Sequence, residues 1–193
     1  APGGGELQRH EIALSAFLGE VDPARIEITS GVFNQPLVRH ASRDVPEVSI
    51  SHTGDRAVAV CFPAGHCIGI DLETVGADPD RTIRSQLTSR ELAAAGSGPL
   101  GERLTCLMIW SMKEALSKAL KCGLTVPLEI LEIDGLLFDG ETACSCGFKN
   151  FNRFKGKADV VAGCVFTLVL PLDSEMIVDA GELSDMMALS RRS

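Results

Sequence analysis

The chain is short of basic residues for a protein that binds nucleic acid. Its 193 residues include 18 lysines and arginines against 26 aspartates and glutamates, which gives a net charge of −8 at pH 7. Nucleic-acid-binding proteins gather positive charge to meet the phosphate backbone, so this balance argues against DNA or RNA as the main partner. An acidic protein partner would have to be met by a local basic patch, because the overall field would repel it.

Neither a long hydrophobic run nor a signal peptide is visible in the sequence. No apolar stretch reaches the ~20 residues that a membrane-spanning helix needs, although 45% of the residues are hydrophobic. We therefore expect a globular protein of the cytoplasm, without a membrane partner. The length of 193 residues is ample for one domain, or for two small halves that are tightly joined.

The seven cysteines form neither a disulfide framework nor an evident zinc site. Their number is odd, and they lack the spacing of a disulfide-rich protein. Cys61, Cys67 and Cys164 lie in apolar segments and are expected to be buried as small hydrophobic residues. Cys144 and Cys146 are close in sequence, but no second pair and no nearby histidine would complete a zinc site.

What the chain does contain is a strand-like segment with two acids, IGIDLE (residues 68–73). Every second residue is isoleucine or leucine, which is the period of a half-buried β-strand. The other face carries Gly69, Asp71 and Glu73. Acids that alternate on a strand most often form its solvated face, so this segment alone does not establish a site.

A second segment, WSMKEALSKAL (residues 110–120), has the spacing of a helix. Trp110, Glu114 and Lys118 lie four residues apart and so share one side. A surface ion pair between Glu114 and Lys118, worth about 0.3 kcal/mol, would explain this spacing without any function. If the helix packs on the acidic strand, however, three carboxylates and an ammonium converge. Oxygen ligands of this kind suit Mg²⁺ that holds a phosphate-bearing substrate.

Upstream lies the segment VSISHTGDRAVAV, which begins at Val48 and has a turn at residues 54–55. Together with the run 57–62 and the acidic strand 68–73, it predicts a meander of three antiparallel strands. His52 lies where the first strand meets its turn. A single histidine there is more often structural than functional, but beside an acidic metal site it could donate to a phosphate.

These three segments, in this order, resemble the signature segments of the 4′-phosphopantetheinyl transferases. The likeness extends from Val48 to Leu128, where GLTVPLE resembles the stretch that follows the catalytic helix in that family. The 42 residues from Asp71 to Lys113 also fit the spacing of the family. The resemblance is to the larger type, which activates polyketide and non-ribosomal peptide synthases.

The resemblance implies a reaction and a fold. Members transfer the 4′-phosphopantetheine arm of coenzyme A to a serine of an apo acyl or peptidyl carrier protein, and they release 3′,5′-ADP in a Mg²⁺-dependent step. The implied fold is α+β, in a monomer of two similar halves related by a pseudo-twofold axis, with the active site at their junction. In this single domain the halves would span about residues 6–98 and 99–175, between a linker-like start (1–5) and a tail (176–193).

The resemblance also implies roles for individual residues. Asp71, Glu73 and Glu114 would bind the Mg²⁺ that bridges the pyrophosphate of coenzyme A. Lys118 would stabilise charge on the leaving 3′,5′-ADP, and Glu114 is the candidate general base, acting directly or through a water. A metal-bound carboxylate is a weak base, which makes the ligand role the firmer of the two. The expected contacts to coenzyme A are Ser51, His52, Thr53, Lys113 and Lys118.

Two residues near Glu114 allow alternative interpretations. Lys113 points about 100° away from Glu114 around the helix, where it either contacts phosphate or is a surface lysine. Trp110 is expected to be a packing anchor rather than a stacking platform.

The chain departs from the family pattern before the histidine segment. Members usually carry a lysine or arginine just before a proline, and here Gln35 precedes Pro36. Glutamine donates a hydrogen bond but no charge, so the grip on the 3′-phosphate is either weaker or supplied elsewhere. Four arginines are candidates to compensate for the missing charge, and for each of them a role as a solvated surface residue is an equally good explanation. They are Arg9, Arg25, Arg39 and Arg43.

The remaining sequence predicts further helices and strands. Helical periodicity covers residues 6–18 and 102–121, and Thr88 has the sequence of an N-cap that opens a short helix. Residues 77–84 are polar and are expected to form a loop. Strands are expected at 26–29, 37–38, 130–138 and 158–170.

The most basic stretch of the chain is CGFKNFNRFKGKAD, residues 146–159. We favour a solvated hairpin whose three phenylalanines enter the core. A docking patch for an acidic carrier protein is the alternative.

Two other functions stay open. A different Mg²⁺-dependent pyrophosphate-cleaving enzyme could use the same three acids, although it would not need His52 in this context. The chain could also be a transferase-like domain excised from a megasynthase. A domain of that kind without catalysis would be expected to have lost metal ligands, and here all three are present.

Overall fold

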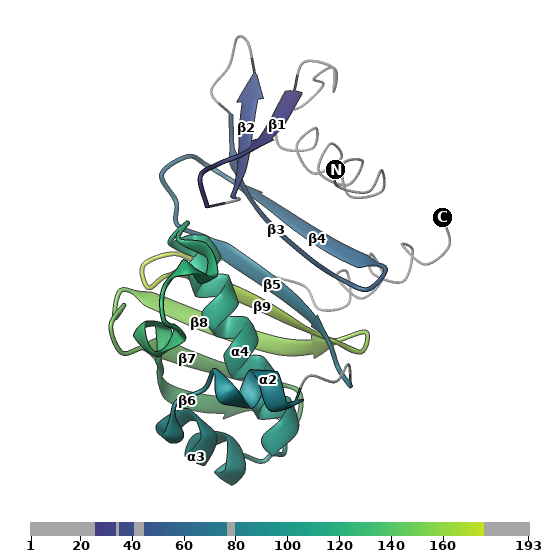
Figure 1. The fold of residues 1–193 in the computed structure, drawn as a ribbon, viewed down its shortest axis with the longest axis vertical. Helices are drawn as coiled ribbons and strands as arrows, with labels where there is room; N and C mark the ends of the chain where they lie inside the picture. Colours follow the sequence, from purple (N-terminus) through teal and green to yellow (C-terminus); the bar gives the residue numbers. More distant parts are fainter. Residues whose placement is uncertain (1–25, 34, 41–44, 77–79, 176–193) are drawn as a thin grey trace.

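The apolar strands of the second half of the chain form most of a five-stranded antiparallel sheet (Figure 1). In this computed structural model β6 (Ile133–Asp139), β7 (Ala143–Phe148), β8 (Phe154–Val161) and β9 (Cys164–Pro171) follow one another as a meander. At the far edge of the sheet β5 (Gly69–Thr74) pairs with β9. The acidic strand of the sequence is therefore an edge strand of the larger sheet.

The structure describes residues 26–33, 35–40, 45–76 and 80–175. The predicted helix at 6–18, the linker-like start and the tail 176–193 lie outside the described residues, and so do Arg9, Arg25 and Arg43.

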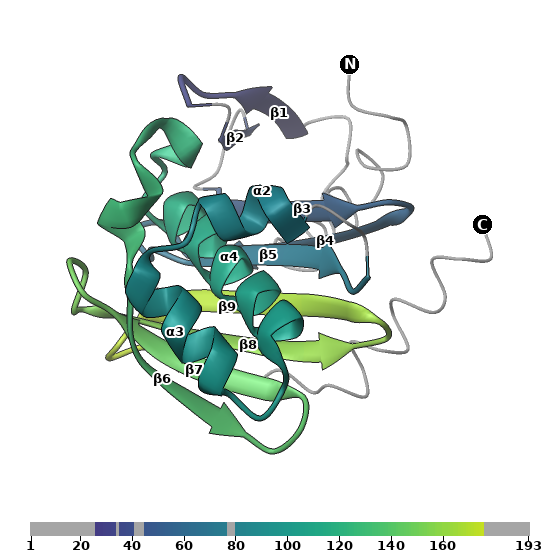
Figure 2. The same cartoon turned by 60° about the horizontal axis from the view of Figure 1, so that its bottom comes forward.

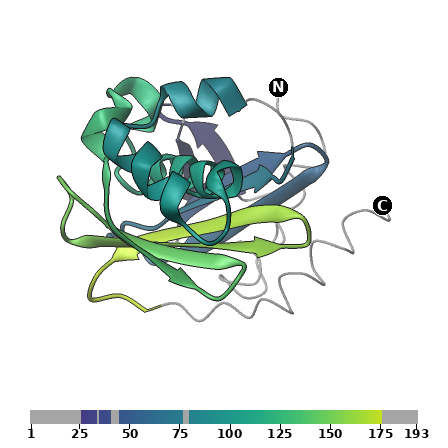
Figure 3. The same cartoon turned by 90° about the horizontal axis from the view of Figure 1, so that it is seen from below.

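Three helices lie on one face of this sheet (Figures 2 and 3). The long helix α4 (Glu102–Ala119) crosses the sheet, and α2 (Asp80–Ser85) and α3 (Ser89–Ser97) pack against it. Two short 3₁₀ turns, η2 (Gly123–Thr125) and η3 (Leu128–Leu131), lead from α4 back to the sheet. Among the described residues no helix is long and apolar enough to span a membrane.

The predicted helices agree with the structure better than the predicted loop does. The long helix is confirmed, and so is the short helix capped by Thr88, whose side chain and that of Glu91 form a complete capping box. The loop expected at 77–84 is wrong from Asp80 onward, where α2 begins. The isolated polar pattern did not reveal the packing of α2 against α4, which holds this short helix through Ile83.

The single strand expected at 158–170 is also wrong. The segment folds back on itself as the β8–β9 hairpin, with its turn at Ala162 and Gly163. Both turn residues have positive φ, the backbone conformation of a tight hairpin turn. Alanine rarely adopts it, so the sequence carried only half of the usual turn signal.

Two hairpins make up the described part of the chain before β5 (Figure 1). β1 (Ile26–Ser30) pairs with β2 (Pro36–His40), which confirms the two short strands. β3 (Glu47–Thr53) pairs with β4 (Arg56–Phe62), which confirms the first two strands of the expected meander. The third is wrong, because β5 joins β9 instead of β4.

Serine side chains explain why β5 does not continue the meander. The outer edge of β5 faces β3, and its backbone N–H groups donate to side-chain hydroxyls there. Ile70 N–H bonds Ser49 Oγ at 3.0 Å, and Leu72 N–H bonds Ser51 Oγ at 3.1 Å. The two edges of β5 are thus satisfied in different ways, one by a strand ladder and the other by two hydroxyls.

The α+β class is confirmed by this arrangement. The expected division at residues 98 and 99 does not follow a sheet boundary, because β5 belongs to the sheet made by β6–β9. The relation of two similar halves stays a prediction.

The two faces of β5 bury different things. Ile70 and Leu72 enter an apolar cluster with Phe62, Phe166 and their neighbours. The opposite face packs on α4 so closely that a Cβ on Gly69 would overlap the carbonyl oxygen of Ala115 and lie 2.7 Å from the backbone nitrogen of Ala119. The glycine of the acidic face is therefore required for the close approach of strand and helix.

We predict that Gly69→Ala destabilises the protein by about 3 kcal/mol or more, because backbone atoms of α4 cannot yield to the added methyl group. Urea denaturation would measure the change. The matched control is Gly96→Ala, a helical glycine of α3 whose Cβ would meet nothing within 4 Å. It should be neutral or stabilising by up to about 1 kcal/mol. Equal stabilities of the two variants would contradict the close-approach argument.

Candidate metal centre between β5 and α4

Three carboxylates meet where β5 packs on α4. Asp71 and Glu73 come from β5, and Glu114 comes from the helix face that packs on this strand. One oxygen of each lies within 4.8 Å of the corresponding oxygens of the other two. The structure thus brings together the three acids that the sequence pattern singled out.

Asp71 is the most buried and most constrained of the three, with 1% of its surface exposed. Its Oδ1 accepts hydrogen bonds from Ser51 Oγ at 2.9 Å and from Lys118 Nζ at 2.7 Å. Its Oδ2 accepts one from Ser111 Oγ at 2.8 Å. Donors from β3 and α4 therefore fix the orientation of this β5 side chain.

The two glutamates carry raised pKa values. Burial raises the pKa of Glu114 to about 8, and the neighbouring Asp71 carboxylate adds to this effect. Burial, followed by the charge of Asp71, also raises the pKa of Glu73, while a hydrogen bond from Trp110 opposes the rise. Because the indole that donates this bond also packs against the core, Trp110 acts as the expected packing anchor.

A divalent cation fits the properties of this cluster. Two oxygens bound to one Mg²⁺ lie up to about 4 Å apart, so small side-chain movements would bring the three acids to bonding distance. Three ionised carboxylates would face the single ammonium of Lys118, so the ionised cluster would hold more negative charge than Lys118 balances. A cation would remove that excess, and oxygen-only donors are the set that Mg²⁺ prefers.

The two lysines of the helical segment lie in different surroundings. Lys118 is part of the cluster through its bond to Asp71. Lys113 is not brought to the carboxylates, because its ammonium is fully buried against Glu91 at 2.8 Å. The Glu91 carboxylate also accepts the backbone N–H groups of Thr88 and Ile133. Lys113 and Glu91 therefore tie α4, α3 and β6 together.

The histidine segment lies beside the acids, on β3. Ser51 is buried, and its hydroxyl is engaged by Asp71 and by the backbone of Leu72. Strand alternation turns His52 to the other face, where it is exposed. The Thr53 hydroxyl lies 3.0 Å from that of Thr74. Of the expected nucleotide contacts on β3, His52 is the one that solvent reaches most freely.

Gln35 has a local structural use. Its Oε1 accepts the backbone N–H of Phe33 at 2.9 Å, and its backbone C=O accepts that of Gly31 at 2.8 Å. A Cβ on Gly31 would overlap the Gln35 amide. The residue that departs from the family pattern closes the turn between β1 and β2. Arg39, on β2, is exposed.

The basic stretch forms the predicted hairpin between β7 and β8. Phe148 is buried, and Phe151 and Phe154 pack against the same core. Two of its charges have acidic partners: Lys149 bonds Glu132 at 2.7 Å, and Arg153 approaches Asp173 at 3.5 Å. The hairpin with its phenylalanines packed against the core is confirmed, and the docking patch stays a prediction.

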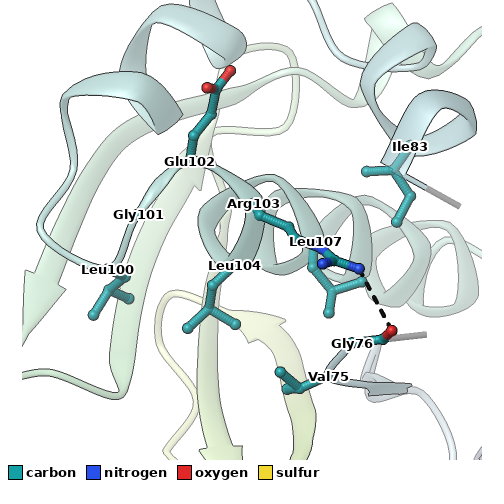
Figure 4. Close-up of a pocket in the computed structure, with 9 residues that line it drawn as sticks. All are labelled: Val75, Gly76, Ile83, Leu100, Gly101, Glu102, Arg103, Leu104 and Leu107. Carbon is teal, nitrogen blue, oxygen red and sulfur yellow. Dashed lines mark hydrogen bonds between the residues drawn. The ribbon is translucent and has the colours of Figure 1, made fainter. Parts of the chain in front are cut away.

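A separate cavity of about 320 Å³ lies at the N-terminal end of α4 (Figure 4). Leu107 on its wall precedes Glu114 by two helical turns, which is about 10 Å along the axis. Arg103 reaches across it to the backbone oxygen of Gly76 at 3.5 Å, whereas Glu102 points away (Figure 4). The cavity therefore lies between the end of β5 and the first turns of α4, beyond the acids. The remaining lining residues are Val75, Ile83, Leu100, Gly101 and Leu104.

Sequence reasoning missed two hydroxyls behind the acids. Ser111 and Thr167 are both fully buried, and Ser111 contacts Asp71 directly. One signal was present, since Thr167 is the sole polar residue of the apolar run CVFTLVL. Its meaning depended on the pairing of β5 with β9.

Comparison with known proteins covers the acidic part of this arrangement. The chain matches the protein-family model described as the 4′-phosphopantetheinyl transferase superfamily over residues 67–164, just over half of its length. A comparison with curated proteins finds no match. The matched region holds all three carboxylates and Lys118, whereas His52 and the rest of β3 precede it.

We predict that the metal-free protein loses stability relative to Glu114→Gln as pH rises. The folded-state pKa of Glu114 is raised to about 8, whereas the unfolded value is about 4.5. The protonated carboxyl therefore stabilises the folded state fully below about pH 4.5, and this stabilisation is lost as pH rises through 8. In EDTA the free energy of unfolding of the variant should rise relative to that of the parent by at least about 1 kcal/mol between pH 5 and 8. This corresponds to a relative rise of about 2–4 °C in Tm.

Thermal unfolding across this pH range would measure the difference. Glu141→Gln, which changes an exposed acid outside the cluster, is the control and should follow the parent at every pH. A gap between Glu114→Gln and the parent that does not change with pH would contradict the prediction.

Proposed function

The chain belongs to the 4′-phosphopantetheinyl transferase superfamily, and on this premise we propose that it transfers the 4′-phosphopantetheine arm of coenzyme A to a serine of an apo acyl or peptidyl carrier protein, with release of 3′,5′-ADP. The observation that carries the proposal is the convergence of three carboxylates and Lys118 within the matched region. We also infer the larger type that serves polyketide and non-ribosomal peptide synthases, acting as a monomer in the cytoplasm.

The proposal assigns Asp71, Glu73 and Glu114 as the residues that hold Mg²⁺. When bound, Mg²⁺ would supply neutralisation of the pyrophosphate charge, which otherwise repels a nucleophile. Lys118 is one helical turn from Glu114, and its ammonium would stabilise the charge that develops on 3′,5′-ADP as it leaves. Breaking the bond between phosphorus and the 3′,5′-ADP oxygen transfers that charge to the leaving group.

Glu114 is the proposed general base for the carrier serine. A base must be deprotonated, and the raised pKa of Glu114 describes the cluster without a cation, in which the carboxyl would keep its proton at neutral pH. The role is therefore compatible with a cation-loaded site. Glu114 would accept the serine proton directly or through a water while the serine oxygen forms its bond to phosphorus.

The nucleotide side of coenzyme A is assigned to β3. His52 is exposed on the strand whose Ser51 bonds Asp71, and it is proposed to donate to the phosphates, with Thr53 next to it. The Ser51 hydroxyl already bonds Asp71 and the backbone of Leu72. We therefore propose that Ser51 contributes to the nucleotide side indirectly, by holding β3, which carries His52, next to β5. Lys113 contributes less to this proposal, because Glu91 encloses its ammonium.

Another Mg²⁺-dependent pyrophosphate-cleaving enzyme is the second candidate. The acids alone would allow it, since a water could take the place of the carrier serine. Such an enzyme would release 3′,5′-ADP from coenzyme A without any carrier protein. A transferase-like domain excised from a megasynthase is the third candidate, and it would act on a carrier of its own synthase.

We predict that incubation with coenzyme A, Mg²⁺ and apo carrier proteins adds one phosphopantetheine group to a carrier. Intact-mass measurement of several acyl and peptidyl carriers would detect it. Asp71→Ala should lower the rate at least about 100-fold, because it removes a metal ligand, and far-ultraviolet circular dichroism should show that the variant stays folded.

Asp173→Asn, which changes an exposed acid paired with Arg153, is the matched control and should keep the parent rate. If no carrier gains mass, the transferase proposal is wrong. Release of 3′,5′-ADP in the absence of a carrier would favour the hydrolase instead.

A further inference from the structure

Two buried hydroxyls stand behind the metal centre in a row that leads to Asp71. Thr167 lies on β9 directly opposite Asp71 in the β5–β9 register, so their side chains share one face of the sheet. Ser111 lies on α4 above both of them. Its Oγ is 2.8 Å from Thr167 Oγ1 and 2.8 Å from Asp71 Oδ2. Both hydroxyl-bearing residues are 0% exposed.

The direction of these hydrogen bonds follows from the chemistry of the groups. A carboxylate oxygen accepts, so Ser111 uses its one hydrogen for Asp71. Ser111 Oγ then accepts the hydrogen of Thr167, which orients the Ser111 hydroxyl toward the acid. Thr167 therefore acts on Asp71 through Ser111, and the row has a single direction.

The other partners of Asp71 make this row the one that sets Oδ2. Oδ1 already accepts two hydrogen bonds, from Ser51 and Lys118, whereas Oδ2 accepts the hydrogen bond of Ser111. Each carboxylate oxygen has two lone pairs, so Oδ2 keeps one for another partner. Ser111 fixes the direction in which that lone pair points.

We propose that Ser111 and Thr167 are positioning residues that hold Asp71 Oδ2 toward the metal of the transferase centre. The inference rests on the proposed function, since it deepens the assignment of Asp71 as a ligand. Outer hydrogen-bond partners of metal-bound carboxylates orient the ligand, and their loss commonly costs about 10–100-fold in metal affinity.

Binding of Mn²⁺ alone, without coenzyme A or carrier, tests the inference by electron paramagnetic resonance or calorimetry. Ser111→Ala should weaken Mn²⁺ binding roughly 10–100-fold, because it removes the donor to Oδ2. Thr167→Val keeps the branched shape of threonine without the hydroxyl and should weaken binding by a smaller factor, about 3–10-fold. Thr167→Ser keeps the hydroxyl and should bind within about twofold of the parent.

The order of the row gives a sharper expectation. Because Thr167 acts through Ser111, the double variant Ser111→Ala/Thr167→Val should bind Mn²⁺ no more weakly than Ser111→Ala alone. In a transfer assay the single variants should raise the KM for Mg²⁺ and recover most of kcat at high Mg²⁺. Loss of folding alone would not produce this split.

Unchanged Mn²⁺ affinity in Thr167→Val and Ser111→Ala would overturn the inference while leaving the metal centre intact. The hydroxyls would then serve only to satisfy one another in the core. If Ser111→Ala does not fold, Thr167→Val against Thr167→Ser still decides. A parent protein that binds no Mn²⁺ would overturn both this inference and the proposed metal centre.

Discussion

The close approach of β5 to α4 is the constraint on which the candidate site depends. It requires Gly69, since any side chain there would enter the backbone of α4 near Ala115. With the strand so close to the helix, Asp71 comes within hydrogen-bonding distance of Ser111 and Lys118. A wider spacing would leave room for water between them, and the acids would then titrate as separate solvated groups.

The site also shows how burial and charge are balanced against each other. Asp71 is enclosed by three donors, one from β3 and two from α4, whereas Glu73 and Glu114 are partly buried and have raised pKa values. Glu91 and Lys113 are also buried, but their opposite charges neutralise each other inside the core. The three ionised carboxylates around Asp71 share one lysine and are left with excess negative charge. A structural ion pair and a candidate cation-binding cluster therefore include neighbouring residues of the same helix, Lys113 and Glu114.

Local patterns predicted the site better than they predicted the sheet. The acids could be found because strand and helix periodicity place Asp71, Glu73 and Glu114 on definite faces, whatever the rest of the fold does. The partner of β5 could not be found in this way, since its ladder is made with β9, almost a hundred residues later. The roles of Lys113, Ser111 and Thr167 depend on that long-range packing. Their surroundings are created by α3 and β9, so their own neighbours in sequence say little about them.

The contact between β3 and β5 has a consequence for how the molecule can change over evolution. Ordinary sheets are joined by backbone groups, which every residue supplies, so their strength barely depends on sequence. Here two serine hydroxyls make the connection, at Ser49 and Ser51. The strength of this contact therefore depends on which residues occupy positions 49 and 51. Substitutions at these two sites could loosen or tighten the strand that carries His52 against the acids, without any redesign of either sheet.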